Sequence, residues 1–250
     1  MINMTINDKR CTLTLDRPKA NALSAELVAQ LGEKLDAVEA DGTVKVVLLQ
    51  GEGRFFSAGA DIKEFALRSA EELEQQSRDT HAVFNRLEHF NVPVIALIKG
   101  AALGGGLELA MSCHIRLSTV DAQLGLPEIN LGVMPGYSGI RRLKSHVGTA
   151  KALEMALTGQ AVSGAEAEVM GLVTKAFPTE DDMVRYAEQL SSTIEGYSLD
   201  SIQGIMAVSA ETEAEKSDDT EARLFGRIFD TDNAKEGVQA FIAKRRPDFK

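Results

Sequence analysis

Apolar and polar residues alternate along the first part of the chain. The alternating apolar positions lie on either side of a turn at Asn7-Asp8 and are Ile2, Met4, Ile6, Cys11, Leu13 and Leu15. A period of two is typical of half-buried strands, so the pattern predicts a β-hairpin. After Ser24 the apolar residues are spaced for one face of a helix. This spacing predicts a helix that Ser24 caps and that buries Leu27, Leu31, Leu35 and Val38.

A strand, a glycine-containing loop and a short helix then occur twice, about fifty residues apart. The predicted strands cover residues 44–50 and 94–99, and they lead through GEGRFFSAG and GAALGGG into helical starts. Such a repeat favours a coiled array of strand and helix units over a doubly wound sheet. Between the two units, Ser69 and Glu72 form a capping box for a helix that ends before Pro93.

Further along the chain, the pattern changes from mixed to helical. Short strands are predicted at 114–118, 122–126 and 173–177, and helices alone at 181–196, 199–210, 219–229 and 233–245. We therefore expect an α/β core domain over residues 1–180 that holds the active site. We expect an all-helical region over residues 181–250 that packs on this body or on a neighbouring subunit.

Composition and charge limit the partners that the chain can have. With 44% hydrophobic and 26% charged residues it has the composition of a soluble globular protein. Its net charge of −10 argues against nucleic acids and anionic membranes as partners. The N-terminus has no apolar signal stretch, and Cys11 and Cys113 are too few for a disulfide framework. We therefore expect a cytoplasmic protein.

Several common motifs are absent from the sequence. Gly104-Gly105-Gly106 is not a dinucleotide fingerprint, because the third glycine of that pattern would fall on Leu109. No glycine run continues as a P-loop, and the glycines around Ser138 lack the spacing of a hydrolase elbow. The histidines show no ligand pairing, so neither a metal site nor a bound cofactor is expected.

Two glutamates stand in mostly apolar surroundings. Glu108 follows the triple glycine within LELAM, and Glu128 follows Pro127 within LGLPEINLG. Burial raises the pKa of a carboxylic acid toward the range where it can transfer protons near neutral pH. Alternatively, each residue is an acid favoured at a helix start, or an exposed residue after a proline.

The glycine loops at 58–61 and 104–107 offer a second candidate feature. A chain that leaves a strand through glycines into a helix exposes backbone N–H groups at the first helical turn. Two such loops could each supply one amide to a single developing oxyanion. The alternative is that the glycines merely permit tight packing of strand against helix.

Three ordered blocks resemble the enoyl-CoA hydratase/isomerase family, also called crotonases. They are FFSAGADIKEF at 55–65, IKGAALGGGLELAMSCHIRLS at 98–118 and AQLGLPEINLGVMPG at 122–136. The resemblance covers essentially the whole chain. It implies a spiral of repeated ββα units, followed by a C-terminal helical region that forms a homotrimer or a dimer of trimers.

The resemblance also implies a reaction and a set of site residues. Family members bind an acyl-CoA thioester and polarise its carbonyl between two backbone amides, which match Ala60 and Gly105. The paired glutamates of the hydratases match Glu108 and Glu128, so we expect an enoyl-CoA hydratase in which coenzyme A is part of the substrate. The expected contacts to substrate and coenzyme A are Ala58, Asp61, Ile62, Lys63 and Arg54, with Phe241 and Lys244 supplied by a neighbouring subunit.

Some alternatives remain open within this resemblance. The same fold could carry an enoyl-CoA isomerase or a dehydratase of a branched 3-hydroxyacyl-CoA. A more remote alternative is an RNA-binding or scaffolding member, against which the net charge and the lack of a long basic stripe count. Tyr137, Ser138 and Ile140 replace residues that are more often small or threonine in the family, so the preferred acyl chain is left open.

Overall fold

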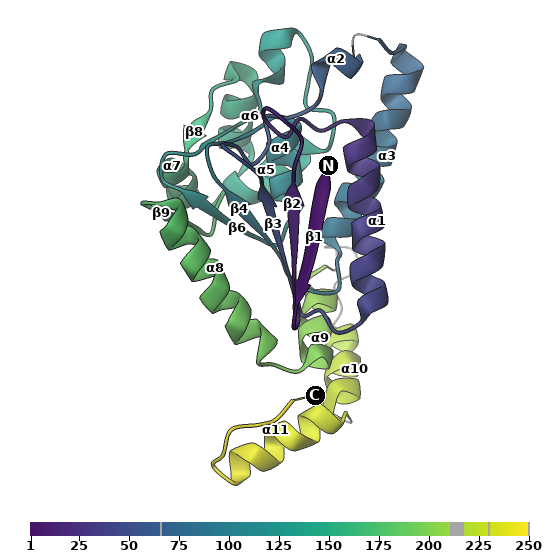
Figure 1. Cartoon of the computed structure of the whole chain (residues 1–250), viewed down its shortest axis with the longest axis vertical. Coiled ribbons are helices and arrows are strands. Elements are labelled where there is room, and N and C mark those ends of the chain that lie inside the picture. The colour runs from purple at the N-terminus through teal and green to yellow at the C-terminus, as the bar shows by residue number, and fades with distance from the viewer. Residues whose placement is uncertain (66, 211–217, 230, 250) are drawn as a thin grey trace.

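The computed structural model describes residues 1–65, 67–210, 218–229 and 231–249. Within these residues, a six-stranded sheet has the order β1-β2-β3-β4-β6-β9, with β1 and β2 antiparallel and the other neighbours parallel (Figure 1). Its strands are β1 (Ile2–Asn7), β2 (Arg10–Leu15), β3 (Val46–Gly51), β4 (Val94–Ile98), β6 (Ile115–Thr119) and β9 (Lys175–Phe177). The predicted N-terminal hairpin is therefore confirmed.

A smaller sheet lies beyond the ends of the main strands. In the described residues it has the order β5-β7-β8, formed by β5 (Ala101–Leu103), β7 (Gln123–Gly125) and β8 (Val162–Ser163). β4 leads into β5 and then helix α4 (Gly105–Met111), and β6 leads into β7 and then the 3₁₀ helix η1 (Pro127–Leu131). After β3, an isolated bridge between Ser57 and Ala102 takes the place of the second strand, before helix α2 (Ile62–Phe65). These units are the predicted repeat, and each ends in a short helical segment.

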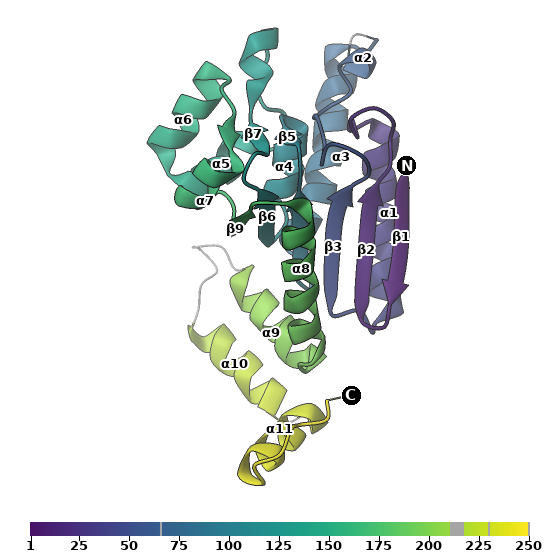
Figure 2. The same ribbon diagram turned by 60° about the vertical axis from the view of Figure 1, so that its left-hand side comes forward.

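Helices cover both faces of the main sheet (Figures 1 and 2). On one side lie α1 (Ala25–Asp41) and α3 (Ala70–Glu88), whose predicted caps at Ser24 and Ser69 are present. On the other side, α8 (Glu180–Glu195) packs Met183 and Ala187 against the apolar side chains of β3, β4 and β6. The first helix of the predicted C-terminal region is thus part of the core packing.

The sequence pattern does not predict α5 (Gly139–Val147) or α6 (Thr149–Thr158). The buried face of α5 carries Arg142 beside Leu143, so a charge interrupts the apolar stripe from which amphipathic helices are recognised. The buried face of α6 consists of Ala152, Met155 and Ala156, whose small side chains give a weak signal. The short helix α7 (Gly164–Val169) follows β8 and begins with a capping box at Ser163.

The remaining helices extend away from the sheet, at the end opposite α2 (Figure 2). They are α9 (Leu199–Ser209), α10 (Asp218–Phe229) and α11 (Asp232–Ile242), close to the predicted ranges. Large apolar side chains are exposed on them, among them Phe225, Phe229, Phe241 and Ile242. No described helix has the length and apolar character needed to cross a lipid bilayer.

Candidate active site

The loop that follows β3 runs against strand β5 and the start of α4 through main-chain contacts. Ser57 N donates to Ala101 O at 3.1 Å, and Leu103 N donates to Ser57 O at 3.1 Å. A Cβ on Gly106 would lie 2.3 Å from Ser57 O, well inside van der Waals contact. This approach therefore requires glycine at position 106, which explains part of the glycine pattern.

The same approach leaves the amides of Ala60 and Gly105 unused. Within the described residues, neither N–H donates to a protein acceptor. Gly105 is the first residue of α4, where N–H groups have no partner inside the helix. An ideal Cβ on Gly105 would lie 3.3 Å from Ala60 N, so the two segments are immediate neighbours. The predicted pair of amides is therefore brought together at one point.

Glu108 projects from α4 beside these amides. Its side chain is 1% exposed. Its Oε1 accepts hydrogen bonds of 2.8 Å from both Tyr137 N and Gly139 N. Burial raises the pKa of Glu108 to about 7, the charge of Glu128 adds to the rise, and the two N–H donors oppose it. Glu108 thus has the pKa of a group that can exchange protons at neutral pH.

Glu128 approaches the same place from η1. A Cβ on Gly104 would lie 2.9 Å from Glu128 Oε1, so the glycine makes room for this carboxylate. Glu128 Oε2 is buried and has no hydrogen-bond partner in the described part of the chain. Burial raises the pKa of this glutamate as well. The two acids that the sequence singled out therefore face a common space.

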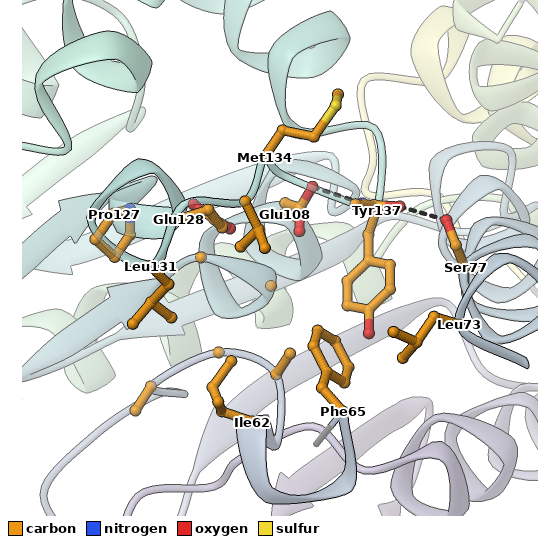
Figure 3. A pocket seen from close by; sticks show the side chains of 17 residues that line it. Ile62, Phe65, Leu73, Ser77, Glu108, Pro127, Glu128, Leu131, Met134 and Tyr137 are labelled. Carbon is orange, nitrogen blue, oxygen red and sulfur yellow. Dashed lines mark hydrogen bonds between the residues drawn. The ribbon is translucent and has the colours of Figure 1, made fainter. Parts of the chain in front are cut away.

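That space is a pocket of about 450 Å³ (Figure 3). Glu108 and Glu128 lie in its middle, and apolar side chains form most of the remaining wall. The lining includes the predicted residues Ala58, Ala60, Ile62 and Gly105, together with Phe65, Leu73, Ser77, Leu131, Val133, Met134 and Tyr137. The helix that contributes Leu73 and Ser77 is recognisable from the sequence, but its position over the pocket is not.

Arg142 supports the loop that binds Glu108, and no sequence pattern singles this residue out. The side chain is 1% exposed and donates from Nη1 to Tyr137 O at 2.7 Å. Its other nitrogens bind Glu88 Oε2 at 3.0 and 3.1 Å and Asn85 Oδ1 at 2.8 Å. An arginine in a helix ordinarily faces water, so its burial follows from the tertiary structure alone.

The other predicted contacts lie outside the pocket. Asp61 pairs with Arg17 at 2.5 Å, and Lys63 is exposed on α2. Arg54 is exposed and stacks on Phe55, with 5.0 Å from its guanidinium carbon to the ring centroid. Phe241 lies on α11 and Lys244 lies just after it. In the molecule, α11 is at the opposite end from α2 and α4, whose residues line the pocket (Figure 2). Among the described residues, no group of three or more His, Cys, Asp or Glu side chains is arranged to hold a metal ion.

A comparison with known families decides the relationship. The family model for enoyl-CoA hydratase/isomerase matches residues 5–250. The chain belongs to this family. It is 43% identical to a probable enoyl-CoA hydratase of Bacillus subtilis, over 100% of this chain and 98% of that protein. It is 39% identical to the 2,3-dehydroadipyl-CoA hydratase of Escherichia coli, over 95% of this chain and 94% of that protein.

Solved structures agree with this assignment. The enoyl-CoA hydratase of Bacillus anthracis superposes with a TM-score of 0.91 at 30% identity, covering 100% of this chain and 98% of that one. The predicted α/β fold of repeated units with a C-terminal helical region is therefore confirmed.

The close contact at Gly106 gives a first prediction for this family member. Gly106→Ala should lower the free energy of unfolding by about 1–3 kcal/mol, because its Cβ overpacks against the carbonyl of Ser57. Gly32→Ala is the matched control, since Gly32 lies inside α1 and its Cβ would make only an ordinary contact of 3.5 Å with Val83 of α3. Urea unfolding of the two variants compares them, and equal midpoints would contradict the contact.

Burial of Glu108 gives a second prediction. Between its ordinary pKa of 4.5 and its folded pKa of about 7, the folded chain retains a proton that the unfolded chain releases. Stability is therefore lost as the pH rises through this window, on the order of 3 kcal/mol in all. Glu108→Gln keeps an oxygen for the two N–H donors and removes the charge.

Glu108→Gln should therefore raise the free energy of unfolding at pH 8 by up to about 3 kcal/mol relative to the parent protein. The difference between the two proteins should shrink toward pH 5. Chemical denaturation at both pH values measures it. Glu33→Gln, on the outer face of α1, is the control. A constant difference across the pH range would show that Glu108 does not carry the effect.

Proposed function

We propose that the protein is an enoyl-CoA hydratase that adds water across the trans-2 double bond to give a 3-hydroxyacyl-CoA. The observation that carries the proposal is the placement of one buried carboxylate, one half-buried carboxylate and two unused backbone amides around one apolar pocket. The names of the Bacillus subtilis and Escherichia coli relatives support it.

The amides of Ala60 and Gly105 form the oxyanion hole in this proposal. Addition of water at Cβ passes negative charge through Cα to the thioester oxygen. Fixed N–H donors that point at the site of this charge stabilise it, and one such donor is typically worth ~10²–10³ in rate. An amide that already donates to a protein acceptor could not bind the thioester oxygen. The absence of such an acceptor for these two amides among the described residues therefore supports their assignment to the oxyanion hole.

The carboxylates of Glu108 and Glu128 move the protons. Glu108 is the proposed general base that activates water, and Glu128 the acid that protonates Cα, with the roles reversed in dehydration. The two backbone donors hold Oε1 of Glu108 and leave Oε2 available for the water. The charge of Glu128 raises the pKa of Glu108, so ionisation of one acid disfavours ionisation of the other. A pair that holds one proton contains both the acid and the base that hydration needs.

The alternative functions account less well for two acids and two free amides around one pocket. An isomerase moves one proton between Cα and Cγ and needs a single acid/base group, whereas two acids face this pocket. A dehydratase of a branched 3-hydroxyacyl-CoA would run the same chemistry in reverse on a different acyl group. Binding of RNA by a chain with a net charge of −10 is disfavoured electrostatically.

Subunit contact is also part of the proposal. We infer that the exposed apolar side chains of α10 and α11 pack in a homotrimer or in a dimer of trimers. In that assembly Phe241 and Lys244 reach the coenzyme A of the adjacent subunit, while Arg54 and Lys63 bind its phosphates locally. Residues 235–250 hold five bases and two acids, which suits the anionic coenzyme. The reaction requires no further cofactor and is expected to take place in the cytoplasm.

The two acids are tested by conservative substitution. Glu108→Gln and Glu128→Gln should each lower kcat for crotonyl-CoA hydration by ~10²–10⁴, because each amide is isosteric but cannot transfer the proton. Loss of the enoyl-thioester absorbance measures the rate, and Glu33→Gln is again the matched surface control. Full activity in either glutamine variant would remove that residue from the mechanism.

A second substrate separates the alternatives in the same assay. A trans-3-enoyl-CoA should be turned over more slowly than crotonyl-CoA by the parent protein. Faster conversion of the 3-enoyl compound to its 2-enoyl isomer would favour the isomerase. A folded preparation that acts on neither substrate would contradict the proposed function.

The coenzyme contact is tested at Lys244. Lys244→Ala should raise KM for crotonyl-CoA more than it lowers kcat, because the side chain binds phosphate and does not touch the reacting atoms. Steady-state kinetics with crotonyl-pantetheine supplies the control, since this thioester lacks the nucleotide and its KM should not respond. An unchanged KM for crotonyl-CoA would contradict the contact.

A further inference from the structure

Ile62 and Leu131 line one end of the pocket, and Phe65, Leu73 and Tyr137 line the other (Figure 3). The side chains of Ile62 and Leu131 are 48% and 60% exposed, which makes theirs the open end, and Val133 and Met134, which also line the pocket, are 49% and 75% exposed. At the other end Phe65 and Leu73 are partly buried, and Tyr137 is 4% exposed. The two glutamates lie between the ends. The open end thus leads to water, and the enclosed end leads toward α3.

The proposed function, on which this inference rests, gives each end an occupant. The thioester oxygen must lie at Ala60 N and Gly105 N, with the double bond beside the glutamates. Coenzyme A is large and anionic and has to reach solvent, so it leaves by the open end. The apolar acyl group beyond Cβ then points to the enclosed end, where its burial is favourable.

The ring of Tyr137 stands across that enclosed end. Its Cδ2 and Cε2 would each lie 3.2 Å from a Cβ on Gly105, so one edge of the ring borders the oxyanion site. Behind it, Phe84 packs edge to face at 5.9 Å between centroids and 77° between planes. Phe84 is fully buried, and Thr80, which lies beside the Tyr137 hydroxyl, is 1% exposed.

The position of the ring is also fixed by its own main chain. Tyr137 N donates to Glu108 and Tyr137 O accepts from the buried Arg142. With both peptide groups held and the buried Phe84 packed behind the ring, an acyl chain cannot push the ring back toward α3. An acyl chain that reaches the ring therefore has to stop there.

We propose that the Tyr137 ring is the end wall of the acyl pocket and restricts the enzyme to short enoyl-CoA substrates. Removal of the ring would open the pocket onto Phe84 and Thr80 and admit longer chains. The hydrogen bond from the main chain of residue 137 to Glu108 does not depend on the side chain. Substitution at this position should therefore change the acyl preference more than the chemistry.

The experiment compares kcat/KM for crotonyl-, hexenoyl-, octenoyl- and decenoyl-CoA. For the parent protein, kcat/KM should fall by about tenfold or more from crotonyl-CoA to decenoyl-CoA. Tyr137→Ala should raise the ratio of decenoyl-CoA to crotonyl-CoA by about tenfold or more. Tyr137→Phe is the matched control, because it keeps the ring and should keep the parent ratio.

Tyr137→Leu guards against failure of the alanine variant to fold. It leaves less empty volume and should shift the preference toward hexenoyl- and octenoyl-CoA. A parent protein that hydrates decenoyl-CoA as well as crotonyl-CoA would overturn the inference, as would an unchanged ratio in folded Tyr137→Ala or Tyr137→Leu.

Failure of this inference can be distinguished from failure of the proposed function. A folded parent protein that hydrates no enoyl-CoA contradicts the hydratase proposal, and the proposed role of Tyr137 in the acyl pocket fails with it. A parent protein that hydrates crotonyl-CoA supports the hydratase proposal, and the chain-length profile then decides the role of Tyr137 alone.

Discussion

The close approach of two main-chain segments is the constraint on which the site depends. Ser57 exchanges hydrogen bonds with the strand before the triple glycine, and Gly106 allows its carbonyl to come close. Because both segments leave the sheet at the same edge, the amides of Ala60 and Gly105 become neighbours while their N–H groups remain unused. The repeat of strand, loop and short helix thus places one unused backbone donor from each of two loops at a single point.

The fold also keeps a carboxylic acid where water hardly reaches it. Glu108 is held by two N–H donors from one loop, and that loop is held by Arg142. Arg142 is in turn paired with Glu88 at the end of α3, so its charge is compensated although it is buried. The position of Glu108 Oε1 therefore depends on packing between α5 and α3, and the raised pKa of Glu108 is maintained at the expense of stability.

Local patterns predicted the parts of the site that local structure creates. The glycine loops and the apolar surroundings of Glu108 and Glu128 are visible in short stretches of sequence, and the structure brings them together. The Arg142–Glu88 pair joins residues 54 positions apart, and the arginine interrupts an apolar stripe, so the pattern conceals both this contact and the helix that carries it. The roles of Phe241 and Lys244 come from the family resemblance, and in this chain they lie at the far end from the pocket.

Tyr137 separates two tasks that often conflict within one residue. Its peptide groups position the acid, and a peptide group is the same whatever side chain it carries. Its ring faces the acyl pocket, and the space that the ring fills depends only on the side chain. A change of side chain at this position can therefore alter the volume offered to the acyl group while Glu108 keeps both of its donors. The proposed acyl wall and the hold on Glu108 therefore use different parts of the same residue.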